Sequence, residues 1–357
     1  MGIDKNYNLM YYFVVSDLRY PVWTEDFFIY MKEFKTLDEQ IELLKTRNII
    51  FENEENAKQV LLHNNYYNII NGYKDLFLDN NDPTLYKQNT SFEEIYALYE
   101  FDRQLRNIFL EYILKIENSL RSLIAYYFSK EYGNDNYLKL DNFETFNNVN
   151  VTIETKQRQI KFIQTLIGNI NKNIAQNMDN KYINHYMTKY GFVPLWVLVN
   201  ILTFGDICNF YRLMKQKQRI EISIEFNIAE TDLSSLLNIL CKTRNLCAHD
   251  ERLYNYEFGT YTTINDTTYH SFLNLPKTNN RYDIGKNDLY AVVIALKLLL
   301  GKDDYHKFHG KLFSRIMSIQ SKLKTIVLDD ILNAMNFPNN WHDILKSPKS
   351  TRDTQDQ

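Results

Sequence analysis

The chain has 357 residues and a hydrophobic fraction of 45%, so it can bury a sizeable core and is not globally disordered. Its net charge of −3 excludes a generally basic nucleic-acid coat protein but allows a local basic patch. Only 10 Gly and 6 Pro occur, and so few helix breakers favour long helices over many short strands. We therefore predict an all-α protein.

The N-terminal region predicts two helices. In the first, over residues 36–47, Thr36 can cap the N-terminus and Glu39 can complete a capping box. A second helix is expected at 53–64. Gly72 and the stretch DNNDP that follows favour a boundary, so residues 1–88 are interpreted as an N-terminal helical region.

The longest helix is predicted over residues 91–133, where apolar residues recur at spacings of three and four. Ser91 and Glu94 have the spacing of a capping box, and Gly133 follows the last turn. Because the span is long for a globular helix, we expect a break near residues 99–102.

The rest of the chain also has mainly helical periodicity, and residues 89–345 are predicted to form one helical domain. Pro194 suits the first turn of a helix, Gly205 marks a break, and Thr231 or Asp232 opens another helix. Further helices are expected at 156–175, 287–300, 303–323 and 328–336, a loop at 134–155, either a short hairpin or an irregular excursion at 256–286, and a flexible tail at 346–357.

The cysteines and the apolar runs indicate where in the cell the protein is expected. Cys208, Cys241 and Cys247 form no CxxC pair, and we interpret them as reduced and buried in a cytoplasmic protein. The apolar run at 9–15 is too short and too poorly flanked for a signal peptide. The run at 289–301 is interrupted by Lys297 and too short to span a bilayer, so no membrane segment is expected.

A polar cluster interrupts the apolar pattern in the stretch CKTRNLCAHDERLYN, residues 241–255. Arg244 is followed directly by Asn245, and His249 comes five residues after the arginine. An imidazole titrates near neutrality and can move a proton, while a guanidinium stays charged and matches two phosphate oxygens. RNA carries its own nucleophile, the 2′-OH. The three side chains therefore suffice for slow RNA cleavage without a metal, and this route would spare DNA.

The spacing of Arg244 and His249 raises a geometric difficulty for RNA cleavage, and it has a simpler interpretation. On a continuous α-helix five residues turn the direction by about 140°, so Arg244 and His249 would not share a face. Either the helix is distorted, or the site gathers groups from several elements or from two copies of the chain. Alternatively, His249 donates to a backbone carbonyl, and Arg244 pairs with Asp250 or Glu251 at a capped helix end.

The stretch RNLCAHDERLYN resembles the signature of the Abi-like proteins, the AbiD/AbiF abortive-infection family of bacterial anti-phage defence. Further segments are similar to the family in the same order and together cover most of residues 36–345. These segments are residues 36–73, YEFDRQLRNIFLEYILKIENSLRS at 99–122, GFVPLWVLVNILTFGDICNFY at 191–211, and MNFPNNWHDIL at 335–345.

The resemblance implies a HEPN-type helical bundle in which Arg244, Asn245 and His249 take the motif positions. HEPN proteins are commonly metal-independent endoribonucleases with sites formed between two HEPN units. A chain with one motif would then act as a homodimer. The resemblance also implies RNA as a partner, both as a substrate and as a small structured regulator in a toxin–antitoxin manner.

Other residues are weaker candidates. Glu117 and Arg121 are spaced as a surface ion pair on a helix, or they support the site together with Asp250. Basic residues that could contact RNA, or merely decorate solvated helix faces, are Arg103, Arg106, Arg212, Lys215, Lys217 and Arg219. His306 and His309 have ligand spacing but no convincing third ligand, so neither a metal nor a cofactor is expected. Trp196 and Trp341 are most simply core anchors.

The sequence thus favours a phage-defence ribonuclease toxin that leaves 2′,3′-cyclic phosphate ends. Two alternatives remain at this point. One is a non-catalytic RNA-binding or protein-binding defence module, and the other is a helical interaction scaffold.

Overall fold

The computed structural model describes residues 34–147 and 150–346. The apolar run at 9–15 and nearly all of the tail expected at 346–357 lie outside the described residues. Within them the fold is helical, as predicted, with a single two-stranded sheet. No helix in the described ranges is both long enough and apolar enough to cross a membrane.

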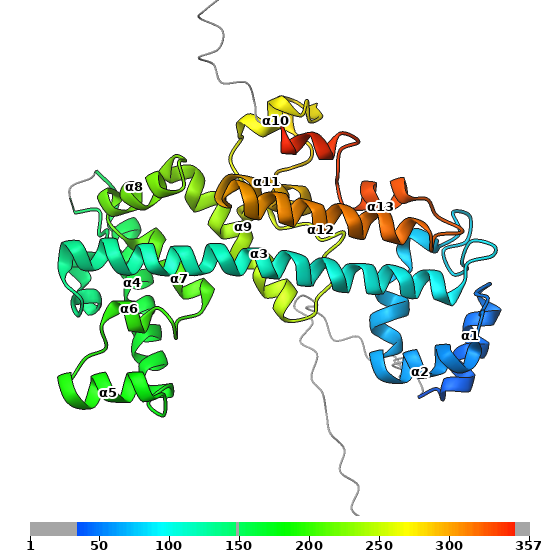
Figure 1. Ribbon diagram of the computed structural model, residues 1–357, viewed down its shortest axis with the longest axis horizontal. Coiled ribbons are helices and arrows are strands. Elements are labelled where there is room, and N and C mark those ends of the chain that lie inside the picture. Colours follow the sequence, from blue (N-terminus) through cyan, green and yellow to red (C-terminus); the bar gives the residue numbers. More distant parts are fainter. Residues whose placement is uncertain (1–33, 148–149, 347–357) are drawn as a thin grey trace, which may run out of the picture.

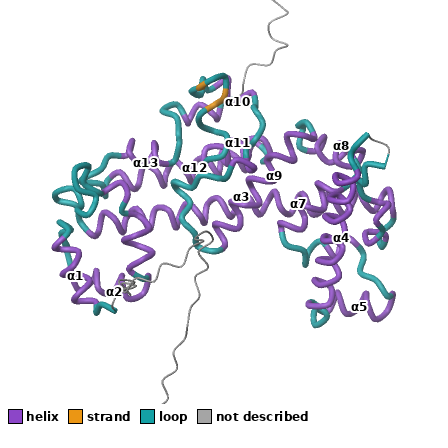
Figure 2. The backbone as a smooth tube through the Cα atoms, turned by 180° about the vertical axis from the view of Figure 1, so that it is seen from behind, coloured by secondary structure: helices purple, strands orange, loops and turns teal. Residues whose placement is uncertain are grey.

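One helix, α3 (Phe92–Tyr132), runs along the whole length of the molecule (Figure 1). The N-terminal helices lie against one end of it, and α4 to α8 gather around the other end (Figures 1 and 2). α9 (Glu230–Ala248) crosses α3 near its middle, and α12 (Lys302–Gln320) packs along it. α3 is therefore the central element against which the other groups of helices pack.

The predicted break in α3 near residues 99–102 is wrong. The helix is continuous over 41 residues and contains no Gly or Pro, the usual causes of a break. Leu98, Phe101, Asp102 and Leu105 are all buried at this point, because neighbouring elements cover the helix on more than one side. This tertiary packing supports a helix that would be long for an isolated amphipathic one.

The N-terminal elements are α1 (Leu37–Thr46), α2 (Glu54–Asn64), a π-helix at Tyr67–Asn71 and a 3₁₀ turn at Asp75–Phe77. The capping box between Thr36 and Glu39 is present. Ile50 joins this region to the start of α3, since its N–H donates to the Thr90 carbonyl and its carbonyl accepts from Phe92. The hydrophobic core continues without interruption from Ile41 to Ile344, across the boundary expected at residue 88.

At the start of α3 the expected capping box is only half formed. The Ser91 hydroxyl accepts from the Glu94 N–H at 3.2 Å, but the buried Glu94 carboxylate does not reach back to Ser91. It accepts instead from the N–H groups of Lys324, Thr325 and Ile326. Glu94 therefore ties residues 324–326, just before α13 (Leu328–Ala334), to α3, a role that local spacing does not reveal.

The far end of α3 is surrounded by shorter helices. Pro194, expected in the first turn of a helix, lies one position earlier, as the N-cap of α6. The break expected at Gly205 lies earlier, because Thr203 and Asp206 form a capping box that starts α7 and leaves Gly205 inside its first turn. The helices here are α4 (Ile153–Gln176), α5 (Lys181–Tyr190), α6 (Leu195–Leu198), α7 (Phe204–Leu213) and α8 (Gln216–Glu225).

Residues 256–286 hold both alternatives, a short hairpin inside an irregular excursion. β1 (Lys277–Thr278) pairs antiparallel with β2 (Arg281–Tyr282) beside α10 (Thr268–Phe272) (Figure 2). The turn residues Asn279 and Asn280 both have positive φ, as a two-residue hairpin loop requires. The remaining helices are α11 (Leu289–Leu299), which is almost entirely buried, α12, and α13 (Leu328–Ala334).

Candidate functional site

The motif residues lie at the C-terminal end of α9. Leu233, Leu236, Leu237 and Leu240 bury one face of this helix in the core, and Arg244 follows one turn later at the edge of that face. The helix is regular up to Ala248, so the distortion considered from the sequence is absent. The Arg244 and His249 side chains therefore leave α9 in directions about 140° apart.

His249 is the C-cap of α9, and its N–H donates to the Asn245 carbonyl at 3.0 Å. Asp250 follows with φ 58°, and the Glu251 N–H donates back to the Leu246 carbonyl. This is a Schellman ending, in which glycine usually occupies the position of Asp250. The turn ends the helix at His249 and leaves the imidazole exposed.

Glu117 is the acidic neighbour of the Arg244 side chain. Glu117 is 3% exposed, and its Oε2 forms an ion pair, without a hydrogen bond, with the Nε of Arg244 3.5 Å away. Its other oxygen accepts from Arg121, which also donates to the Val199 carbonyl. One buried carboxylate thus holds two guanidinium groups, and the cluster keeps a net positive charge while the Arg244 side chain remains 31% exposed.

Two expectations about this cluster are corrected. Arg244 pairs with Glu117 on another helix, and not with Asp250 or Glu251 on its own segment. Glu117 and Arg121 form a buried ion pair and not a solvated surface pair, because α9 and the turn after α6 cover this part of α3. Burial makes the pair far more sensitive to loss of either partner than a surface pair would be.

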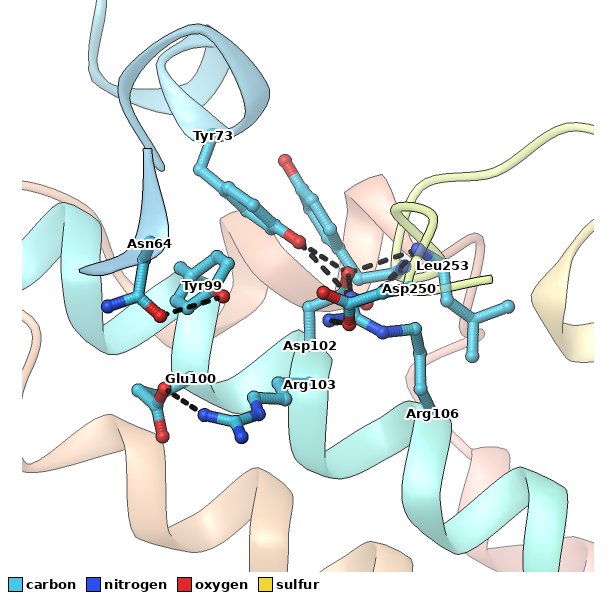
Figure 3. A network of polar contacts seen from close by, with 10 residues as sticks. Asn64, Tyr73, Tyr99, Glu100, Asp102, Arg103, Arg106, Asp250 and Leu253 are labelled. Carbon is cyan, nitrogen blue, oxygen red and sulfur yellow. Dashed lines mark hydrogen bonds and ion pairs between the residues drawn. The ribbon is translucent and has the colours of Figure 1, made fainter. Parts of the chain in front are cut away.

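Asp250 is held by a second buried network, which Figure 3 shows. Asp102, fully buried on α3, accepts from the Tyr73 hydroxyl, from Arg106, and from the N–H groups of Leu253 and Tyr254. Arg106 in turn reaches the carboxylate of Asp250. Asp102 therefore fixes the chain just after the motif, and Arg106 connects it to the residue next to His249.

The RNA contact expected for Arg106 is wrong for this chain. Its side chain is 3% exposed, and its terminal nitrogens are occupied by Asp102, Tyr73 and Asp250. Burial alone would lower the pKa of Arg106, but Asp102, Tyr73 and Asp250 together outweigh it and raise that pKa above its usual value. The guanidinium is a fixed structural cation.

A polar cleft of about 420 Å³ opens beside Asp250. Asn64 lies at its edge and accepts a hydrogen bond from Tyr99, and Arg103 lies on the same side of α3 (Figure 3). His63, at the end of α2, also lines it. Sequence analysis missed His63, because nothing local connects α2 with a motif almost two hundred residues later. The predicted RNA contact of Arg103 stays a prediction.

In the basic run that joins the end of α7 to α8, two of the four cations pair with carboxylates. Arg219 pairs with Glu230 at 2.7 Å, and Lys217 pairs with Glu131 at 2.8 Å. Arg212 and Lys215 lie over the rings of Phe162 and Tyr132 respectively. RNA contacts by Arg212, Lys215, Lys217 and Arg219 therefore stay predictions.

One further sequence interpretation changes. Trp341 is 2% exposed and is a core anchor, but Trp196 is 51% exposed and is not one. His309 is buried and packs on Trp341, with ring centroids 5.0 Å apart. Among the described residues, no three His, Cys, Asp or Glu side chains are grouped so that they could hold a metal ion.

The three cysteines are free thiols, as predicted, but only Cys247 is fully buried. Burial raises the pKa of the Cys247 thiol to about 12. Cys208 and Cys241 are half-buried, and a hydrogen bond from Cys208 together with the nearby Arg244 lowers the pKa of Cys241. The expectation of three buried cysteines therefore holds for one of them.

Comparison with known protein families gives one result. The family model described as Abi-like protein matches residues 59–255, which is more than half of the chain and includes α3, the motif and the networks of Figure 3. The chain belongs to the Abi-like protein family. Membership of this family implies abortive-infection defence. No curated protein and no solved structure matches the chain significantly.

Proposed function

We propose that this Abi-like protein is a metal-independent endoribonuclease toxin of abortive-infection defence that acts as a homodimer on RNA. The observation that carries the proposal is the end of α9. There a buried carboxylate on α3 holds the partly exposed Arg244, and a Schellman turn presents His249 to solvent. Residues with the chemistry for RNA cleavage are thus accessible on a rigid support.

The reaction needs no group beyond the RNA and these side chains. The 2′-oxygen attacks the adjacent phosphorus while an imidazole removes its proton. The bond from phosphorus to the 5′-oxygen breaks, and that oxygen receives a proton as it leaves. The products are a 2′,3′-cyclic phosphate and a free 5′-hydroxyl. Arg244 would stabilise the charge on the phosphorane, and Asn245 would orient the substrate by hydrogen bonds.

The geometry supports a site made by two copies. Within one chain, Arg244 and His249 diverge by about 140° around a regular helix, so they do not converge on one phosphate. A two-fold axis near the end of α9 would bring His249 of one copy toward Arg244 of the other. In such a site the imidazole that accepts the proton from the 2′-oxygen delivers it to the leaving oxygen.

The test is cleavage of labelled single-stranded RNA by the purified protein in the presence of a metal chelator. We expect products with 2′,3′-cyclic phosphate ends. His249→Ala should lower the rate by about 10²–10⁴-fold, because general acid–base catalysis is lost. The variant should remain folded by circular dichroism, since the imidazole makes no described side-chain hydrogen bond. His306→Ala, on an exposed part of α12, serves as the matched control.

Undiminished cutting by His249→Ala would remove the proposed role of this residue. Binding of RNA without any cleavage would support instead a non-catalytic RNA-binding module. Neither binding nor cleavage would favour a helical scaffold. Sequencing RNA that co-purifies with the protein would identify an associated regulatory RNA.

A further inference from the structure

A cleft lies between α3 and α6, next to the Arg121–Glu117–Arg244 cluster. Its volume is about 660 Å³. Arg121 belongs to both features, since it lines the cleft and also pairs with Glu117. The lining residues are Asn118, Arg121, Ser122, Ala125, Tyr126, Ser129, Lys130, Trp196, Val199 and Asn200.

Two aromatic side chains in this lining are unusually exposed. Trp196 is 51% exposed and Tyr126 is 63% exposed. The packing of α6 does not depend on Trp196, because the neighbouring Leu195 and Leu198 are fully buried and anchor the helix. Leaving an indole in water forgoes a large hydrophobic gain, so its place in a cleft points to a ligand with a flat apolar face.

The remaining lining is polar and positively charged. Asn118, Ser122 and Asn200 supply amide and hydroxyl groups. The cations are Arg121, which shares Glu117 with Arg244, and Lys130, whose exposed side chain pairs with Glu221 at 3.5 Å.

We propose that this cleft binds one unpaired nucleotide of RNA, with its base against Trp196. A nucleobase offers the flat face and the polar edge that the lining matches, and its phosphate offers the charge that Arg121 and Lys130 complement. Bases inside a duplex are stacked on each other, so only an unpaired one can enter. The inference deepens and rests on the proposed function, because it assigns the class of substrate to unpaired RNA beside Arg244.

Arg121 gives the cleft a structural link to the motif. Its guanidinium donates to the Val199 carbonyl at the end of α6 and to Glu117 on α3. The residue therefore clamps the helix carrying Trp196 to the carboxylate that holds Arg244. A nucleotide seated in the cleft would fix the position of the adjoining RNA backbone relative to Arg244.

The test measures RNA binding in the His249→Ala background, so that cleavage does not interfere. Fluorescence anisotropy with a labelled single-stranded RNA of about 12 nucleotides, at constant salt, gives the dissociation constant. We expect Trp196→Ala to weaken binding about tenfold or more, because stacking on one base is lost. Trp196→Phe should retain most of the affinity. Tyr261→Ala, which removes a side chain that is 96% exposed on another surface, should have no effect.

A duplex form of the same RNA should bind more weakly and should not respond to Trp196→Ala. Unchanged single-strand affinity in Trp196→Ala would overturn the inference, and so would the absence of RNA binding by the parent protein. Failure of the proposed function is separate: binding that depends on Trp196, in a protein whose wild type does not cut RNA, would contradict cleavage and leave the nucleotide site in place.

Discussion

At the scale of single residues, buried charges fix the side chains around the motif. Glu117 holds Arg244 from another helix, and Asp102 holds the chain after His249 through two backbone N–H groups and through Arg106. Removing one partner of such a buried pair leaves an uncompensated charge, which typically costs about 3–5 kcal/mol. These carboxylates are thus structural supports for the exposed groups that would meet RNA.

Another buried residue, His309, predicts a dependence of stability on pH. Burial, together with the nearby His342, His306 and Lys297, lowers the pKa of His309 to about 4 from an ordinary value of 6.5. Because the unfolded state binds the proton first, the stability from neutral His309 is complete above about pH 6.5 and decreases as the pH falls toward 4. Between pH 7 and 5, this contribution should fall by about 2 kcal/mol.

Urea unfolding at both pH values, for the wild type and for His309→Gln, measures this contribution. The comparison between variants is necessary because Asp288 acts in the opposite direction. Burial raises the pKa of Asp288 to about 6, so its protonation favours the folded state as the pH falls. His185→Gln, on an exposed part of α5, is the control. The same pH dependence in His309→Gln and in the wild type would contradict the assignment.

At the scale of elements, the end of α9 combines backbone strain with an ion pair. Asp250 has φ 58°, where an L side chain costs about 1–2 kcal/mol, yet its carboxylate pairs with Arg106. Glycine would fit the turn better but would leave Arg106 without this partner. Asp250 therefore adopts a strained backbone conformation, and its carboxylate connects the end of α9 to α3 through Arg106.

Two substitutions separate these effects. Asp250→Gly and Asp250→Ala both remove the carboxylate, but only glycine adopts positive φ without strain. We expect Asp250→Ala to be the less stable variant by about 1 kcal/mol in urea unfolding, with both less stable than the wild type. Equal stability of the two variants would show that the left-handed turn is not maintained.

The elements also show which local patterns predict structure. Thr36 and Glu39 form their capping box because both partners lie within one turn and nothing else competes for them. Glu94 has the same spacing from Ser91, but buried N–H groups from residues 324–326 attract its carboxylate away. α5 and α8 were not predicted as separate helices, since they are short and their burial depends on neighbours that only the fold supplies.

At the scale of the whole molecule, the chain is extended along α3, and the motif lies near the middle of this long axis (Figure 1). The N-terminal helices meet the motif region through Tyr73 and the cleft containing His63, and the opposite end contributes the cleft with Trp196. The proposed dimer would therefore place two clefts of different character on either side of each site.

If the site is shared between two copies, mixing two inactive variants should restore some RNA cleavage. Arg244→Ala and His249→Ala should each be inactive alone. If each site takes Arg244 from one copy and His249 from the other, a mixed dimer keeps one intact site. Random exchange of subunits should then restore about a quarter of the wild-type cleavage rate. No restoration, despite verified exchange by size-exclusion chromatography and mass spectrometry, would contradict a shared site.

The sequence by itself determined the helical class, the positions of most long helices, the family resemblance and the motif residues. These depend on periodicity, capping and spacing, which are local properties of the chain. Only the tertiary structure decided that Arg244 pairs with Glu117, that Arg106 is buried, and that Trp196 and His63 line clefts beside the motif. These contacts and exposures depend on which distant segments pack against each other and exclude water. No local sequence pattern predicts that packing.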